Sequence, residues 1–159
     1  MKRQTRQLGD IVRIDLGDGF HSYARVLEEA LFAFYDSRTE QAPPIDKIIA
    51  LPVLFIVPVM RYAVTRGRWK VIGSMPLDVS LSNPPPRFMQ DALNLNSFST
   101  YHKGKIRPAT MEECVGLECE AAWDPDHVED RIRDHYLGRK NKWVEPLKIK
   151  IPPGKTTGK

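Results

Sequence analysis

Cysteine is scarce in this chain: only two occur among its 159 residues. Cys114 and Cys119 are separated by four residues, and no second pair of cysteines or histidines stands at the spacing of zinc ligands. A small disulfide-rich fold is excluded by the same count. The sequence therefore predicts two small buried thiols in a reducing compartment.

Long apolar runs are also missing. The most apolar stretch, residues 48–60, contains two prolines and falls short of the ~20 residues that a membrane span requires. The basic residues 1–7 lead into no apolar stretch, so they do not form a signal peptide. We therefore expect a cytoplasmic protein with no membrane partner.

The motifs of the common enzyme classes are absent. No serine lies in a Gly-x-Ser-x-Gly elbow, and Gly9, Gly17 and Gly19 belong to a hairpin pattern, not to a phosphate-binding loop before a helix. His127 and His135 stand eight residues apart on a predicted helix, about 12 Å along its axis, which is too far to share one metal ion. The sequence thus indicates no catalytic residue, no metal site and no cofactor.

Charge is unevenly placed along the chain. The net charge is +4, of which residues 1–7 carry +3 and residues 138–159 carry +6, leaving −5 for residues 8–137. An acidic body repels nucleic-acid phosphates, so we do not expect nucleic acid as a partner. A nucleic-acid-associated protein that uses its basic tails is the alternative.

Alternating apolar residues predict strands in the first forty residues. Residues 10–16 and 20–27 alternate around the turn Gly17-Asp18-Gly19, and residues 31–35 add a third short strand, which together indicate an antiparallel meander. Pro58 places a later strand at an edge or a bulge of the sheet. Further strands are expected at residues 54–60, 68–73, 87–91 and 97–101.

One longer helix is predicted at residues 124–137. Asp124 is a favoured N-cap residue, Pro125 suits the first helical position and Gly138 ends the helix. Single helical turns are expected at residues 45–50 and 110–113. We expect one domain over residues 1–138, followed by a basic, Pro-, Lys- and Gly-rich tail at residues 139–159 that is partly disordered.

Carboxylates gather in and around the first three strands. Three interpretations remain open for them: a metal or acid–base site, a face that docks a basic partner, or ordinary surface and turn chemistry. The residues taken as the candidate docking face are Asp10, Asp15, Asp18, Glu28 and Asp36.

The order of these segments resembles the immunity protein 26 family over roughly residues 8–118. The resemblance implies an α+β fold and a bacterial immunity protein of a polymorphic toxin system, which binds and neutralises a cognate toxin without catalysis. It supplies no residues of the binding site. The matching segments are Gly9–Ile14, Tyr23–Leu27, Phe32–Asp36, Pro52–Phe55, Val59–Met60, Gly67–Gly73, Pro76–Leu77 and Pro84–Asp91.

A rival resemblance starts from the same strands. Gly-Asp-Ile-Val at residues 9–12, followed by Arg25 on the return strand, is similar to the SH3-like barrel endoribonuclease toxins. That family has proline after the arginine and a long loop, whereas this chain has Val26 and a tight turn. Under this alternative, Arg25 and His21 would cleave RNA from one strand face. Both resemblances imply a small, strongly curved, mainly antiparallel sheet, like that of an SH3-like barrel.

The sequence hypothesis is a non-enzymatic inhibitor. Its acidic body would face a basic toxin, such as a nuclease, because opposite charges speed association. The expected partner is the cognate toxin protein; the oligomeric state is left open by the sequence.

Overall fold

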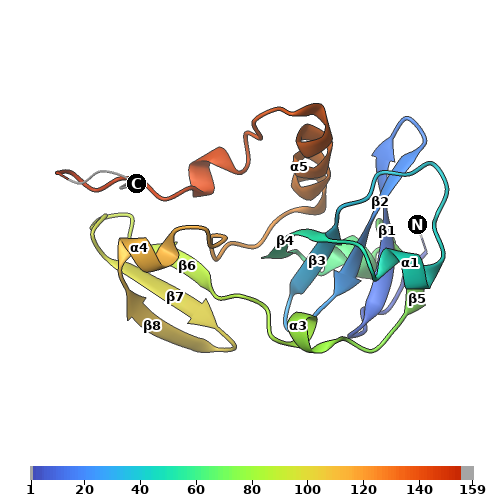
Figure 1. The fold of residues 1–159 in the computed structure, drawn as a ribbon, viewed down its shortest axis with the longest axis horizontal. Helices are drawn as coiled ribbons and strands as arrows, with labels where there is room; N and C mark the ends of the chain where they lie inside the picture. Colours follow the sequence, from blue (N-terminus) through green and yellow to red (C-terminus); the bar gives the residue numbers. More distant parts are fainter. Residues whose placement is uncertain (1, 155–159) are drawn as a thin grey trace. The chain divides into compact units, whose positions relative to one another are not determined.

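A computed structural model describes residues 2–154 and shows an α+β protein with two antiparallel sheets (Figure 1). The contacts divide the chain into two compact units. Unit 1 contains the residues up to Pro84 together with Ala121–Asn141, and unit 2 contains Pro85–Glu120 together with the residues from Lys142 onward. The expected fold class is confirmed.

Unit 1 contains a five-stranded sheet in the order β4-β3-β2-β1-β5. The predicted meander and its turn are confirmed, with Asp18 and Gly19 at φ of 55° and 80°. The prediction for Pro58 is also confirmed, because β4 lies at an edge, where a missing N–H is tolerated. The strands are β1 (Asp10–Gly17), β2 (Phe20–Val26), β3 (Leu31–Tyr35), β4 (Val53–Pro58) and β5 (Lys70–Ser74).

Both faces of this sheet are buried. On one face Tyr23 and Tyr35 pack with Ile48 of helix α1 (Ile45–Ile48). On the other face Phe32 and Phe34, two residues apart on β3, meet the ring of Trp69 edge-on at centroid distances of 5.4 and 5.7 Å. Aromatic contacts of this kind add about 1 kcal/mol each beyond the burial of their area.

Helix α5 (Pro125–Leu137) is confirmed close to its predicted bounds. Gly138 adopts the left-handed conformation that ends it, at φ of 67°. The Asp124 side chain makes no capping bond to the helix backbone and accepts a hydrogen bond from the Tyr62 hydroxyl at 3.1 Å. Two single-turn helices in unit 1 were not expected: α2 (Tyr62–Thr65) and α3 (Val79–Ser82).

Unit 2 contains a three-stranded sheet and a small core of its own. The capping box before α4 (Met111–Cys114) is confirmed, with Thr110 and Glu113 bonded to each other's backbone. Its strands are β6 (Arg87–Gln90), β7 (Phe98–His102) and β8 (Lys105–Ala109), and its core residues are Phe88, Phe98, Met111 and Cys114.

The described part of the basic tail has defined contacts. A 3₁₀ turn forms at Glu145–Leu147, and the Gln90 side-chain amide bonds both the carbonyl and the N–H of Lys150, at 2.7 and 2.9 Å. Residues 155–159, for which disorder was also expected, lie outside the described residues. The single domain expected over residues 1–138 includes residues of both units. Whether the two units unfold together, as one domain would, is a question for an unfolding experiment.

Candidate functional site

A buried carboxylate anchors α5 in unit 1. Glu129 is 6% exposed and accepts hydrogen bonds from Nε and Nη2 of Arg68, at 2.9 and 2.7 Å, and from Nε1 of Trp69 at 2.9 Å. The hydrogen bond to Glu129 is the main cause that raises the pKa of Arg68. Glu129 therefore joins α5 to Arg68 and Trp69, the two residues that precede β5. Its sequence position in the first half of the helix did not reveal this role.

Beside this ion pair lies a shallow pocket of about 340 Å³. Its lining consists of Asp15 and Gly17 at the end of β1 and the Arg68–Glu129 pair. The Asp15 carboxylate is exposed and accepts the Gly17 N–H at 2.9 Å. Because Arg68 and Glu129 neutralise each other, Asp15 gives the pocket a net negative character, which suits a cationic side chain of a partner.

The hairpin end of the sheet brings three of the five predicted docking residues together in one region. Asp18 is exposed in the β1–β2 turn next to Asp15. Asp15 pairs with His21, and His21 pairs with Thr39. Asp36 precedes Thr39 by three residues, is exposed, and accepts a 2.6 Å hydrogen bond from the Tyr136 hydroxyl of α5. Burial and this bond raise the pKa of Tyr136.

The other two predicted docking residues lie elsewhere. Glu28 is exposed in the β2–β3 turn, at the opposite end of β2, about 20 Å along the strand from the hairpin. Asp10 is 3% exposed and accepts the Gln7 N–H at 3.0 Å, so its carboxylate orders the N-terminal segment. The five residues therefore do not form one continuous face.

Arg25 performs a structural task. It is 2% exposed and donates from Nε to the Gly9 carbonyl at 3.0 Å and from Nη1 to the Tyr35 hydroxyl at 3.1 Å. Its Nη2 donates to the carbonyls of Met75 and Pro76, each at 2.8 Å. The guanidinium thus joins β2 and β3 to the segments before β1 and after β5, and its nitrogens face the protein interior.

Gly9 belongs to the same arrangement. A Cβ at this position would lie 2.3 Å from the Met75 carbonyl oxygen, and the backbone has φ of 88°. Only glycine fits such a close approach with that conformation. The Gly9-Asp10 pair and Arg25, which attracted the comparison with ribonuclease toxins, therefore form scaffold contacts.

The cysteines are free, as predicted; Cys114 is buried and Cys119 half-buried. Burial raises the pKa of both thiols, so neither is an activated nucleophile. Near the start of α5, ligand atoms of Asp124, Asp126 and His127 lie within 4.8 Å of one another and could approach a cation. His135, by contrast, stacks edge-on against Tyr136.

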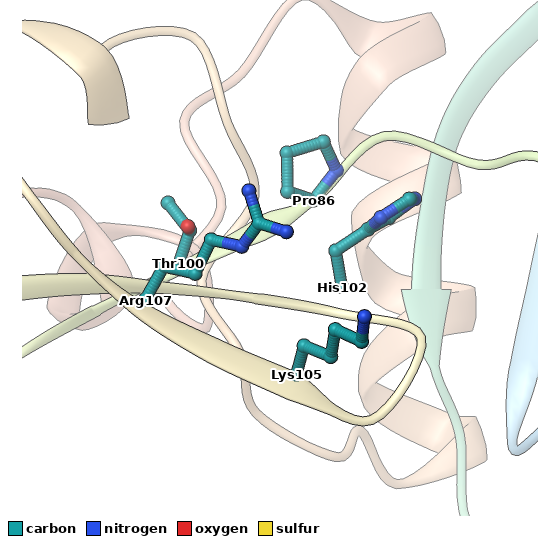
Figure 2. A pocket seen from close by; sticks show the side chains of 5 residues that line it. All are labelled: Pro86, Thr100, His102, Lys105 and Arg107. Atoms are coloured by element: carbon teal, nitrogen blue, oxygen red, sulfur yellow. The ribbon is translucent and has the colours of Figure 1, made fainter.

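A second pocket, of about 220 Å³, lies on the β7–β8 hairpin of unit 2 (Figure 2). Its lining is largely basic: Pro86, Thr100, His102, Lys105 and Arg107. Sequence reasoning missed this site because it did not predict β8. The sequence pattern that indicates this hairpin is the pair Thr100-x-His102 and Lys105-x-Arg107, which stand on either side of the two-residue turn Lys103-Gly104.

Comparison with known families identifies the class of protein. The model of the Immunity protein 26 family matches residues 7–99, more than half of the chain. The chain belongs to this family. No curated protein and no solved structure gave a match.

In this immunity protein, the family match covers β1 to β6 and ends inside β7. The resemblance seen in the sequence extended further, to residue 118. The match includes Asp15, Asp18 and Arg68, whereas Glu129 of the same pocket comes from α5, beyond the matched residues. None of the helices between residues 2 and 154 has the length and apolar composition of a membrane span.

Proposed function

We propose that this immunity protein binds and neutralises a cognate bacterial toxin domain, as a non-enzymatic inhibitor in the cytoplasm of a cell that carries a polymorphic toxin system. Family membership is the observation that carries this proposal. The toxin is the partner; neither nucleic acid nor membrane is required.

The acidic hairpin end of unit 1 is the proposed docking surface. Asp15, Asp18 and Asp36 are exposed there. The nearby pocket beside Arg68 and Glu129 gives a lysine or arginine of the toxin a place to insert. A nuclease fits this surface best, because enzymes that bind nucleic acids carry basic surfaces and complementary charge accelerates association.

The test measures binding to the toxin domain encoded beside this gene. Asp15→Asn with Asp18→Asn removes two charges from the hairpin end, and asparagine keeps the side-chain oxygen that accepts the Gly17 N–H and tolerates the positive φ of residue 18. We expect a loss of affinity of about 10-fold or more, mostly in the association rate, with a weaker salt dependence.

The matched control is Glu28→Gln with Asp46→Asn, which removes two exposed charges away from the hairpin end. We expect the control to change affinity less than about 3-fold. A larger loss of affinity in the control than in the Asp15 and Asp18 variant would place the interface at the Glu28 end of β2. Absence of binding by the unmodified protein would reject the toxin as partner.

A further inference from the structure

The basic pocket of unit 2 is built by the register of one hairpin. Thr100 pairs with Arg107 and His102 pairs with Lys105. Directly opposed residues of an antiparallel pair project from the same face, so all four side chains stand on one side of the sheet. Lys103 and Gly104 form the tight turn with φ of 49° and 82°, which fixes this register.

The same face changes character along the hairpin. Toward its base it carries Phe98 and Ala109, which pack in the core of unit 2, and toward its tip it carries the four polar side chains. Figure 2 shows Lys105 and Arg107 rising from β8 on the side of Pro86 and His102. The packed base and the two-residue turn fix the backbone positions from which Lys105 and Arg107 project.

Lys105 and Arg107 place two positive charges at the mouth of this pocket. Lys105 and Arg107 are exposed and form no ion pair with any residue between 2 and 154. On the same unit, Glu120 pairs with Arg87 and Glu113 caps α4. Lys105 and Arg107 are two residues apart on β8 and therefore stand on the same face, where their like charges repel each other and oppose the fold that holds them.

We propose that this pocket binds one phosphate group, either inorganic phosphate or the phosphate of a small monoester. Arg107 supplies a planar donor fork, Lys105 a compact charge, and Thr100 a hydroxyl. A phosphate offers three acceptor oxygens and a charge near −2, whereas a carboxylate offers two oxygens and a single charge.

The size and lining of the pocket favour a small ligand. At about 220 Å³ it is smaller than the range of roughly 300–1,000 Å³ typical of sites for larger ligands. The one ring among its five lining side chains that could stack on a base is the small imidazole of His102, and the larger platforms Trp, Tyr and Phe are absent from the lining. The phosphate itself is therefore the group that the pocket recognises. This proposal does not depend on the proposed binding of a toxin.

The test is a calorimetric titration of the full chain with inorganic phosphate, and separately with adenosine monophosphate. Arg107→Gln and Lys105→Gln are expected to weaken phosphate binding about 10-fold each. Lys103→Gln, in the turn of the same hairpin but outside the pocket, removes an equal charge and is expected to change binding less than about 2-fold.

Thermal unfolding gives a second readout. Without phosphate, Lys105→Gln should raise the melting temperature slightly because it relieves the repulsion between Lys105 and Arg107 on one face of β8. Added phosphate should raise the melting temperature of this variant less than that of the unmodified protein. Equal losses from Lys103→Gln and Lys105→Gln would show general electrostatic attraction and overturn the proposal. So would absence of saturable binding up to about 20 mM phosphate, or tighter binding of an Asp/Glu-rich peptide.

Discussion

Arg25 shows how one buried side chain joins distant segments of unit 1. Its guanidinium reaches the Gly9, Met75 and Pro76 carbonyls and the Tyr35 hydroxyl. Arg25→Lys keeps the charge but cannot reach all four acceptors. We expect it to lower the free energy of unfolding by about 3 kcal/mol, because the buried oxygens lose charged donors. Urea unfolding measures this change.

Arg38→Lys is the matched control for Arg25. Arg38 is exposed and its guanidinium lies 3.6 Å from the centroid of the Phe20 ring, so we expect a change below about 1 kcal/mol. If Arg25→Lys were as stable as the unmodified protein, the guanidinium would not serve the structural role assigned here. Loss of an RNA-cleaving activity in that stable variant would restore the ribonuclease alternative.

At the scale of single residues, the sequence did not show which of the carboxylates are exposed. Asp10, Asp15 and Asp18 were grouped because they are close in sequence. Asp10 is buried nevertheless, since the segment around residues 6–7 folds over it. Burial depends on which distant segments pack against a residue, and period-two alternation shows only the face on which it stands.

At the scale of elements, Glu129 holds α5 to unit 1. Glu129→Gln replaces the carboxylate by an amide, which weakens the bonds from Arg68 and Trp69. The Arg68 side chain is 41% exposed and can form hydrogen bonds to water instead. We therefore expect the free energy of unfolding to fall by about 2 kcal/mol, less than for a fully buried pair. Urea unfolding and the NMR signal of the Trp69 indole N–H measure it.

Asp126→Asn provides the control on the same helix. Asp126 is exposed in the first turn of α5, where its favourable interaction with the helix dipole is worth below about 1 kcal/mol. An unchanged Trp69 signal in Glu129→Gln would contradict the proposed contact. The comparison separates loss of the specific ion pair from loss of negative charge near the helix start.

Local patterns explain which elements the sequence could predict. Strands β1 and β2 alternate around a turn and β3 is a short apolar run, while α5 carries an N-cap residue, a first-position proline and a terminal glycine. Strand β8 has four exposed residues in succession and contains Pro108, which a strand tolerates only at an edge. Its basic pocket was missed for the same reason, because the pocket exists only through pairing with β7.

At the scale of the whole molecule, the two units differ in the size of their cores. Unit 1 buries both faces of a five-stranded sheet, whereas unit 2 relies on a three-stranded sheet and one helical turn. Small units bury a smaller fraction of their surface and are therefore less stable. Unit 2 should open more readily than unit 1, although the chain passes between them three times.

Phe98→Leu tests this independence by hydrogen exchange. Phe98 is 6% exposed in the core of unit 2, and leucine leaves a small void that costs about 1 kcal/mol. We expect amides of β6, β7 and β8 to exchange about 5-fold faster, while those of β2 and β3 keep their rates. Phe34→Leu, in the core of unit 1, should produce the complementary pattern. Equal acceleration in both sheets by Phe98→Leu would instead show that the residues unfold as the single cooperative domain expected from the sequence, because only a shared global opening would expose both sheets together.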